Sequence, residues 1–474
     1  MKKGFKLLGF IVLAIYTAFG SMAVRAQEAK IGDVRRVILE KPVELKNGYG
    51  TSNLVVSTQL TGSAREQLQR YMQEGMLRYI GFHWHSAIRH FNMALKLEPS
   101  NPVALALKAS SYSEINADAS DIQELFRLAL TNRSFPLDRE DSAFIRYLFS
   151  KWNIPRRKGL STWREIAEVV APMADRFIAI VPFTKMDYLA QLGYNAFNID
   201  ALKKVIEREP LNPAANHFLV HLYENTQGNL AIQHARIYAE AAPESAHAQH
   251  MYGHILPQAG KWKEALLQFK KSHDLHVREM KSEGILPSED WHYSHNIDLM
   301  TSTMVFLEDH ATAAQLFAEA CSSGTPSCQT GVALDILDGR YSSAGRKLES
   351  YYSNNLDHPT ILADRILIAI GSKDMKRIRA LVGSAQVQGE FDEETMLFAR
   401  TAYEIIVKKS DPQTVRELFG VIAARLARPG FDRWSGGVLN SRKLMRVLHD
   451  NGHADLAEEL KTLAISLSGR AMCM

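Results

Sequence analysis

Histidines gather in one part of this chain and recur there at a fixed spacing. Ten of the 17 histidines lie between His217 and His295. His217 and His221 return 33 residues later as His250 and His254. Neutral imidazole is a common nitrogen ligand of first-row transition metals, and two imidazoles four residues apart on a helix share one face and can bind one ion. The spacing therefore predicts a metal site.

Five histidines are the predicted metal ligands: His217, His221, His250, His254 and His295. Five further residues near the same predicted face form a second rank of candidates: His247, His292, Glu224, Tyr293 and Asn296. Zinc, copper, nickel and iron all accept imidazole ligands, so the sequence predicts a divalent transition metal without selecting one. The alternative for each single histidine is a hydrogen bond to a nearby carbonyl or carboxylate.

Other histidines fall outside the aligned positions. The i,i+3 pair His247 and His250 recurs 45 residues later, and the excess over 33 indicates an insertion within residues 274–287. Histidines in this insertion, on second helices or near the first predicted hairpin turn are expected at the surface: His83, His85, His90, His234, His273 and His276.

The spacing also indicates the elements that must position these side chains. A repeat of 33 residues is close to one helical hairpin of a solenoid, in which successive hairpins stack and equivalent residues form columns. Asn212 before Pro213 is a typical helix start, and Pro257 with Gly260 separates two helices. Ser288-Glu289-Asp290 starts a further helix. The chain is therefore predicted to be all-α, an α-solenoid of helical hairpins with a short extended N-terminal segment.

The residues inside the hairpins resemble the tetratricopeptide repeat, which places small residues where its two helices touch and an aromatic residue where they need filling. Residues 68–101 carry this pattern, and equivalents begin near Ala246 and Ser294. The matching residues are Gly75, Ala87, Phe91, Ala94 and Pro99, then Gly253, Ala265 and Phe269, then Ala313, Phe317 and Ala320.

The histidine segments carry a closer resemblance. Asn216 to His221 and Ala242 to Trp262 are similar to a family of bacterial tetratricopeptide-repeat proteins with a histidine-rich double repeat and a preceding aromatic hairpin like Phe82-His83-Trp84. The similarity covers about residues 60–320 and is looser at residues 291–296. It implies that the first helix of each hairpin lines a concave groove, and it implies no activity.

The N-terminus predicts the compartment. Lys2, Lys3 and Lys6 precede an apolar run that ends in Val24-Arg25-Ala26, which is typical of a secretory signal peptide cleaved after Ala26. The alternative is an uncleaved membrane anchor. The protein is expected to be exported to the periplasm or the cell exterior.

The expected domains are a signal peptide at 1–26, an extended arm or small strand pair at 27–62, tetratricopeptide-like repeats with the histidine-rich face at 63–340, and C-terminal helical repeats at 341–474.

The net charge bears on the class of binding partner, and the cysteines bear on disulfide formation. Four of the 56 Lys and Arg residues lie in residues 1–26, whereas all 52 Asp and Glu residues lie beyond it, so the mature chain carries no net charge. That neutrality argues against nucleic acid as a partner. Cys321 and Cys328 flank a turn-like segment and are candidates for a disulfide in an oxidising compartment, with two free thiols as the alternative.

These patterns favour an exported binding scaffold whose concave groove accepts a peptide or protein partner and carries the histidine site. A membrane contact is expected only if the signal segment stays uncleaved. The alternative is a metalloenzyme, in which a histidine-bound metal activates water and Glu224 or Tyr293 transfers a proton. The chain has no Gly-x-Ser-x-Gly motif, no His-Glu-x-x-His helix and no phosphate-binding glycine loop, which makes the enzyme the second choice.

Overall fold

A computed structural model describes residues 38–115, 117–153, 195–224, 227–322, 329–353, 356–388, 396–427 and 439–468. These residues are mostly helical and contain no β-strand, which confirms the predicted all-α class. The predicted signal peptide lies outside them, as does the side chain of each cysteine of the predicted disulfide. Among these residues, no helix combines the length and the apolar character needed to cross a bilayer.

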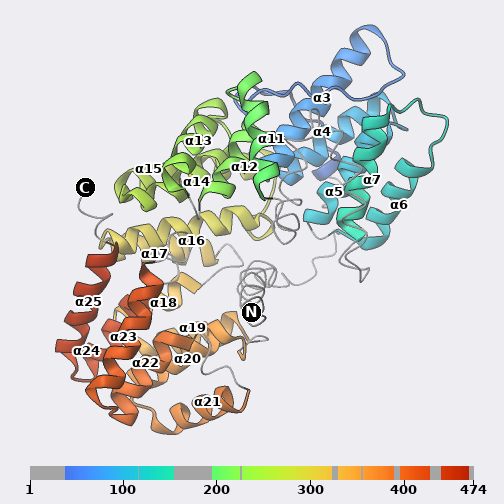
Figure 1. Cartoon of the computed structure of the whole chain (residues 1–474). Helices are drawn as coiled ribbons and strands as arrows, with labels where there is room; N and C mark the ends of the chain where they lie inside the picture. Colours follow the sequence, from blue (N-terminus) through green and yellow to red (C-terminus); the bar gives the residue numbers. More distant parts are fainter. Residues whose placement is uncertain are drawn as a thin grey trace, which may run out of the picture.

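Consecutive helices pack against each other in neighbouring pairs (Figure 1). In chain order they are α3 (Gly62–Ile80), α4 (Trp84–Leu97), α5 (Pro102–Glu114), α6 (Ala119–Thr131), α7 (Arg139–Asn153), α11 (Asn195–Arg208), α12 (Pro213–Tyr223), α13 (Gly228–Ala241), α14 (Ala246–Ile255), η3 (Leu256–Ala259), α15 (Trp262–Glu283), η4 (Pro287–Glu289), α16 (Trp291–Phe306), α17 (His310–Ser322), α18 (Gln329–Leu337), α19 (Tyr341–Tyr351), α20 (Pro359–Gly371), α21 (Met375–Val387), α22 (Leu397–Ala402), η6 (Tyr403–Lys408), α23 (Pro412–Leu426), α24 (Leu439–Asp450) and α25 (Ala454–Ser468).

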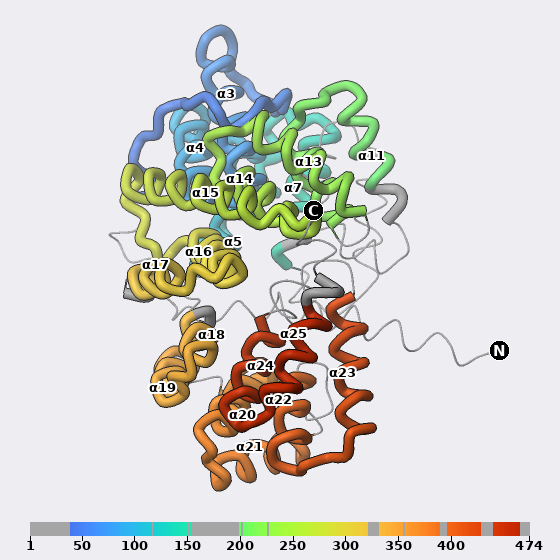
Figure 2. Tube along the Cα trace, turned by 90° about the vertical axis from the view of Figure 1, so that its left-hand side faces the viewer, coloured from blue at the N-terminus to red at the C-terminus, as the bar shows by residue number. Residues whose placement is uncertain are grey.

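Two clusters of buried apolar side chains hold these helices together. One cluster runs from Leu39 to Ile255 and the other from Leu256 to Ala464. In both views α16 and α17 lie between the helices α3–α15 and the group α18–α25 (Figures 1 and 2). The predicted boundary after residue 340 falls inside the second cluster. The histidine-bearing helices α14 and α16, which belong to the first and the second cluster respectively, therefore lie where the two cores meet, whereas α12 lies within the first.

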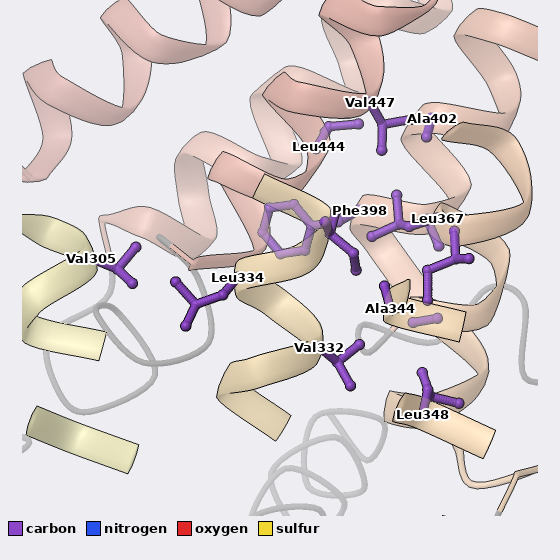
Figure 3. Close-up of a cluster of buried hydrophobic side chains, with 14 of the residues drawn as sticks. Val305, Val332, Leu334, Ala344, Leu348, Leu367, Phe398, Ala402, Leu444 and Val447 are labelled. Carbon is purple, nitrogen blue, oxygen red and sulfur yellow. The ribbon is translucent and has the colours of Figure 1, made fainter. Parts of the chain in front are cut away.

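The second cluster continues from the histidine region into the C-terminal helices. Leu334, Leu367, Phe398 and Leu444, from α18, α20, α22 and α24, are all buried in it (Figure 3). Burial of such side chains is the main favourable contribution to folding. The C-terminal helices therefore share one continuous core with α15 and α16.

The expected helix starts lie where capping residues place them. The Asn212 side chain accepts from the backbone N–H of Ala215 at 2.9 Å, and Pro213 is the first residue of α12. Asp290 caps α16 in the same way, and Gly260 has a left-handed φ of 73° between η3 and α15. A side-chain oxygen satisfies a backbone donor that the first helical turn leaves free, so each cap fixes where its helix begins. These predictions are confirmed.

The predicted insertion lengthens a helix. Helix α15 has 22 residues, and its added C-terminal turns reach the α3–α4 hairpin. There Glu279 pairs with Arg78 at 3.4 Å and Glu283 pairs with Arg89 at 3.3 Å, all four side chains being largely buried. These ion pairs hold the α3–α4 turn over the histidine-bearing helices.

Residues 38–61 form an irregular arm along the first hairpin. Leu39, Leu54 and Val56 are buried against it. The Gln69 side chain exchanges two hydrogen bonds with the backbone of Val56, at 2.9 and 2.8 Å, and Asn92 donates to the carbonyl of Leu39 at 2.9 Å. The arm is therefore held by side chains of α3 and α4, and the strand-pair alternative is not found in the described part of this segment.

Glycines allow the paired helices to approach closely. A Cβ added to Gly75 on α3 would lie 2.6 Å from Phe91 Cε1 on α4, and one added to Gly253 on α14 would lie 3.0 Å from the Phe269 ring on α15. Carbon atoms at ordinary contact stand about 3.5–4.0 Å apart. The small residue and the aromatic residue thus form one contact, as their spacing predicted.

Replacing Gly75 by alanine is expected to lower the free energy of unfolding by about 1–3 kcal/mol, because the new methyl group overlaps the buried Phe91 ring. Urea unfolding followed by circular dichroism measures this. Gly383→Ala on α21 is the matched control, since its Cβ meets nothing within 4 Å. That control is expected to gain up to about 1 kcal/mol from helix propensity. Equal effects of both substitutions would contradict the close contact.

Candidate metal centre

Three consecutive first helices of the hairpins present the histidines. Helix α12 carries His217 and His221, and α14 carries His250 and His254, each pair one turn apart. His247 lies at the start of α14, after the Ser245 cap that accepts from the N–H of Ala248 at 3.3 Å. The caps fix where these short helices begin, and the rings of His217 and His247 meet between them.

Three imidazole nitrogens converge at this meeting point. Nε2 of His217 lies 3.1 Å from Nε2 of His221 and 2.8 Å from Nε2 of His247. The ligand atoms of these three residues all lie within 4.8 Å of one another. Among the described residues, they form the one group of histidine, cysteine or acidic side chains close enough together to hold a metal ion. We call His217, His221 and His247 the histidine triad. Two of its members were predicted ligands, and His247 was in the second rank.

Neighbouring groups influence the protonation of the triad rings. The backbone of Ile80, at the end of α3, favours the charged form of His217 and so opposes the lowering of its pKa by burial. Nδ1 of His221 lies 3.6 Å from Oε2 of Glu224, one turn later on α12. An acceptor beside one ring nitrogen places the proton there and leaves the other nitrogen as a lone-pair ligand. Glu224 therefore orients His221 rather than joining the triad.

The other predicted ligands lie beside the triad, outside the group in which the nitrogen atoms converge. His250 Nδ1 is 3.0 Å from Oδ1 of Asn296, whose amide is in turn fixed by the carbonyl of Phe269 at 3.1 Å. The rings of His250 and His295 are 4.9 Å apart. Nδ1 of His254 lies 3.7 Å from Oε2 of Glu224. These residues thus form a second layer of imidazoles next to the triad, in which His250 and His254 are buried and His295 is partly buried.

A chain of close contacts continues from the triad to Asp290. His247 Nδ1 lies 2.7 Å from His292 Nε2, and His292 Nδ1 lies 2.7 Å from His276 Nε2. His276 Nδ1 lies 3.2 Å from Asp290 Oδ2. Tyr293, the remaining second-rank residue, instead stacks on His273 at 5.5 Å.

Three of the histidines expected at the surface are buried, so that prediction is wrong for them. His276 is 2% exposed because α15 continues through the predicted insertion and turns this residue toward α16. His83 is bound through Nδ1 to Glu279 at 2.7 Å, and His90 through Nδ1 to the Ser86 carbonyl at 2.7 Å. His85, His234 and His273 are partly exposed.

Aromatic rings cover the triad. The Phe82 ring lies 4.2 Å from the His247 ring and 5.5 Å from the His217 ring. Beyond it the rings of Trp84 and Trp291 stack at 5.8 Å. Phe82 has a φ of 62°, which a bulky side chain adopts only at an energetic cost that the surrounding packing must offset. The expected open groove is therefore closed at the histidines, since the α3–α4 turn packs on them.

Burial decides the protonation of these rings. Desolvation, followed by the charges of neighbouring imidazoles, holds the pKa values of His217, His247, His250 and His292 well below the usual 6.5. Desolvation also lowers the pKa of His254 to about 4 and that of His295 to about 3. These six imidazoles are therefore neutral at pH 7, the form in which histidine binds metals.

Carboxylates next to the cluster remain ionised. Burial raises the pKa of Glu224, but its hydrogen bond and charge interaction with His221 outweigh that effect and lower it. The pKa of Asp290 is likewise lowered, because His276 and the N–H of Tyr293 together outweigh its burial. Two acceptor groups of fixed charge thus flank the neutral histidines.

Comparison with known proteins does not assign a function to this chain. No protein-family model matches the chain, and neither does any curated protein. The resemblance to tetratricopeptide repeats therefore stays a prediction beyond the pairing of the helices. The function must be inferred from the histidine triad and its surroundings.

Proposed function

We propose that this protein binds one divalent first-row transition metal ion through Nε2 of His217, His221 and His247. The proposal rests on the convergence of these three nitrogen atoms. Nε2 of His217 lies in the middle, 2.8 Å from Nε2 of His247 and 3.1 Å from Nε2 of His221. Ligand nitrogens around a tetrahedral zinc ion stand about 3.3 Å apart, as bond lengths of about 2.0–2.1 Å require. Small adjustments of the side chains would bring the triad to that geometry.

Hydrogen bonding between the rings accounts for only part of the convergence. A neutral imidazole carries one N–H, so His217 can donate at most one proton from Nε2. Glu224 beside Nδ1 of His221 favours a proton on that nitrogen and leaves His221 Nε2 as a lone pair. Nε2 of His217 faces the Nε2 atoms of both His221 and His247, so one proton cannot serve both contacts fully. A cation between the three nitrogens would bind all of them at once.

The surroundings favour a metal over a proton as that cation. His217 is fully buried and His247 is 2% exposed, so an added proton would be poorly solvated. A metal ion instead spreads its charge over three bonds and requires neutral imidazoles, the state that burial supplies. The donor set of three nitrogens suits zinc, copper, nickel and iron.

Three protein ligands leave one coordination position for another group. Structural zinc sites have four protein ligands, whereas catalytic sites with three keep the fourth position open. The His221 side chain is 20% exposed, and it is the member of the triad through which the site is nearest to solvent. This geometry supports the metalloenzyme as the second candidate, with Glu224 next to the exposed ligand.

The rest of the chain is proposed to be an exported scaffold of tetratricopeptide-like hairpins around this site. The contacts of Gly75 with Phe91 and of Gly253 with Phe269 support that repeat type, and the N-terminal sequence supports export to the periplasm or exterior. A peptide or protein partner remains a separate proposal. Burial of the triad means that such a partner would contact other surfaces than the histidines.

Elemental analysis of the untagged chain tests the metal proposal. After incubation with zinc and dialysis, we expect one ion per chain in the wild type and none in the triple variant His217→Ala, His221→Ala, His247→Ala. His310→Ala with His449→Ala is the control, since both are at least a third exposed and lie outside the cluster. No retained zinc, copper, nickel or iron in the wild type, or equal retention in the triple variant, would contradict the proposal.

A further inference from the structure

We infer that Asp290, acting through His276 and His292, fixes the ring of His247 in the tautomer whose Nε2 lone pair points into the histidine triad. The inference rests on the proposed metal site, and it assigns positioning roles to three residues that do not touch the metal. It concerns which nitrogen of each ring carries the proton.

The contacts form one unbranched line. Asp290 Oδ2 lies 3.2 Å from His276 Nδ1, and the next two links, from His276 to His292 and from His292 to His247, are 2.7 Å each. The line ends where His247 Nε2 lies 2.8 Å from His217 Nε2. Every ring uses one nitrogen toward Asp290 and the other toward the triad.

The carboxylate at one end sets the direction of every hydrogen bond. Asp290 Oδ1 already accepts from the backbone N–H groups of His292 and Tyr293, at 3.0 Å each. An ionised carboxylate has only acceptors, so His276 must donate from Nδ1, and in the neutral ring Nε2 then accepts. His292 must in turn donate from Nδ1 to His276 and accept at Nε2. His247 therefore donates from Nδ1, and its Nε2 is left without a proton.

Nearby groups do not offer a competing anchor. The other carboxylate on this side, Glu279, is bound to His83 Nδ1 at 2.7 Å and to Arg78 at 3.4 Å. His276, His292 and His247 are each no more than 2% exposed, so bulk water has little access to their nitrogens. The line of three imidazoles thus depends on Asp290 for its direction.

Replacing Asp290 by asparagine is expected to reverse the line. Asparagine is as good a helix cap as aspartate, so its carbonyl oxygen can keep both backbone hydrogen bonds. Its NH2 group would then face His276 Nδ1 and donate to it. His276 would donate from Nε2, His292 likewise, and His247 would carry its proton on Nε2. That nitrogen could no longer bind a metal without losing the proton.

Nitrogen-15 NMR of the metal-free protein reads the tautomers directly. In the wild type we expect His247, His292 and His276 all to carry the proton on Nδ1, and in Asp290→Asn all three on Nε2. Zinc affinity is expected to fall by about tenfold to a hundredfold in the variant, as for other residues that orient a metal ligand. Asp411→Asn is the matched control, because Asp411 caps α23 through Oδ1 and touches no histidine.

The outcomes separate this inference from the proposed function. Nδ1 protonation in the wild type and its reversal in Asp290→Asn support the line of hydrogen bonds even if no metal binds. Nε2 protonation of His247 in the wild type, or identical spectra and zinc affinity in the two proteins, would overturn it. Should Asp290→Asn fail to fold, the wild-type spectrum alone decides, since one tautomer is expected for each of three rings.

Discussion

Replacing His247 by alanine is expected to weaken zinc binding by at least a hundredfold, whereas replacing His250, one turn later on the same helix, is expected to change it by less than tenfold. His247 supplies one of the three converging nitrogens, and His250 is directed to Asn296 instead. Changes to residues that only orient a ligand cost about tenfold to a hundredfold, so loss of a ligand should exceed that range.

The two substitutions are closely matched. Both residues are histidines on α14, and each is 2% exposed, so each variant loses a buried ring and leaves a similar cavity. Isothermal titration with zinc gives both affinities. Similar losses in the two variants would favour a site centred on the wider predicted set, and an unaffected His247→Ala would exclude the triad.

Acid is expected to destabilise the metal-free protein steeply between pH 6.5 and 4. In the unfolded chain each histidine takes up a proton near pH 6.5, but His254 and His295 resist it until about pH 4 and about pH 3 in the folded state. Below pH 6.5 the unfolded state therefore binds more protons, and stability falls as the pH falls. At pH 5 each of these residues should cost about 2 kcal/mol.

The matched comparison is the double variant His254→Gln, His295→Gln. Its free energy of unfolding in urea should fall less between pH 7 and pH 5 than that of the wild type, by about 4 kcal/mol for the two residues together. The comparison uses the change with pH, so a lower absolute stability of the variant does not affect it. An identical pH dependence in the two proteins would show that these rings are protonated as readily in the folded chain as in the unfolded one.

Much of the architecture was accessible from the sequence because it depends on local rules. Asn212 and Asp290 cap helices by bonding backbone groups two or three residues away, so their positions fix helix starts without reference to the rest of the chain. The i,i+4 spacing of His217 and His221 likewise brings two nitrogens together on one helix. These predictions are confirmed.

The third ligand and its supporting residues depend on packing between helices. In the 33-residue repeat, the residue equivalent to His217 is His250. The ring that contacts His217, however, is that of His247, in the first turn of α14. His276 was expected at the surface because it falls within the predicted insertion. The ion pairs of Glu279 and Glu283 with the first hairpin show that the segment is a helix with a buried face.

The packing of Phe82 over the triad could not be predicted from the sequence either. Phe82 has a left-handed backbone that no local pattern of bulky residues predicts, and its contacts come from helices more than a hundred residues away. The resemblance to tetratricopeptide repeats implied an open groove lined by the histidines. Long-range packing turned it into a buried site, which is why a metal is favoured over a peptide at the histidines.

Anomalous diffraction at the zinc absorption edge, from crystals of the zinc-loaded protein, tests the central claim most directly. One peak is predicted between α12 and α14, within about 2.0–2.1 Å of Nε2 of His217, His221 and His247. A peak held by other residues, or no peak at the triad at saturating zinc, would contradict the proposed site.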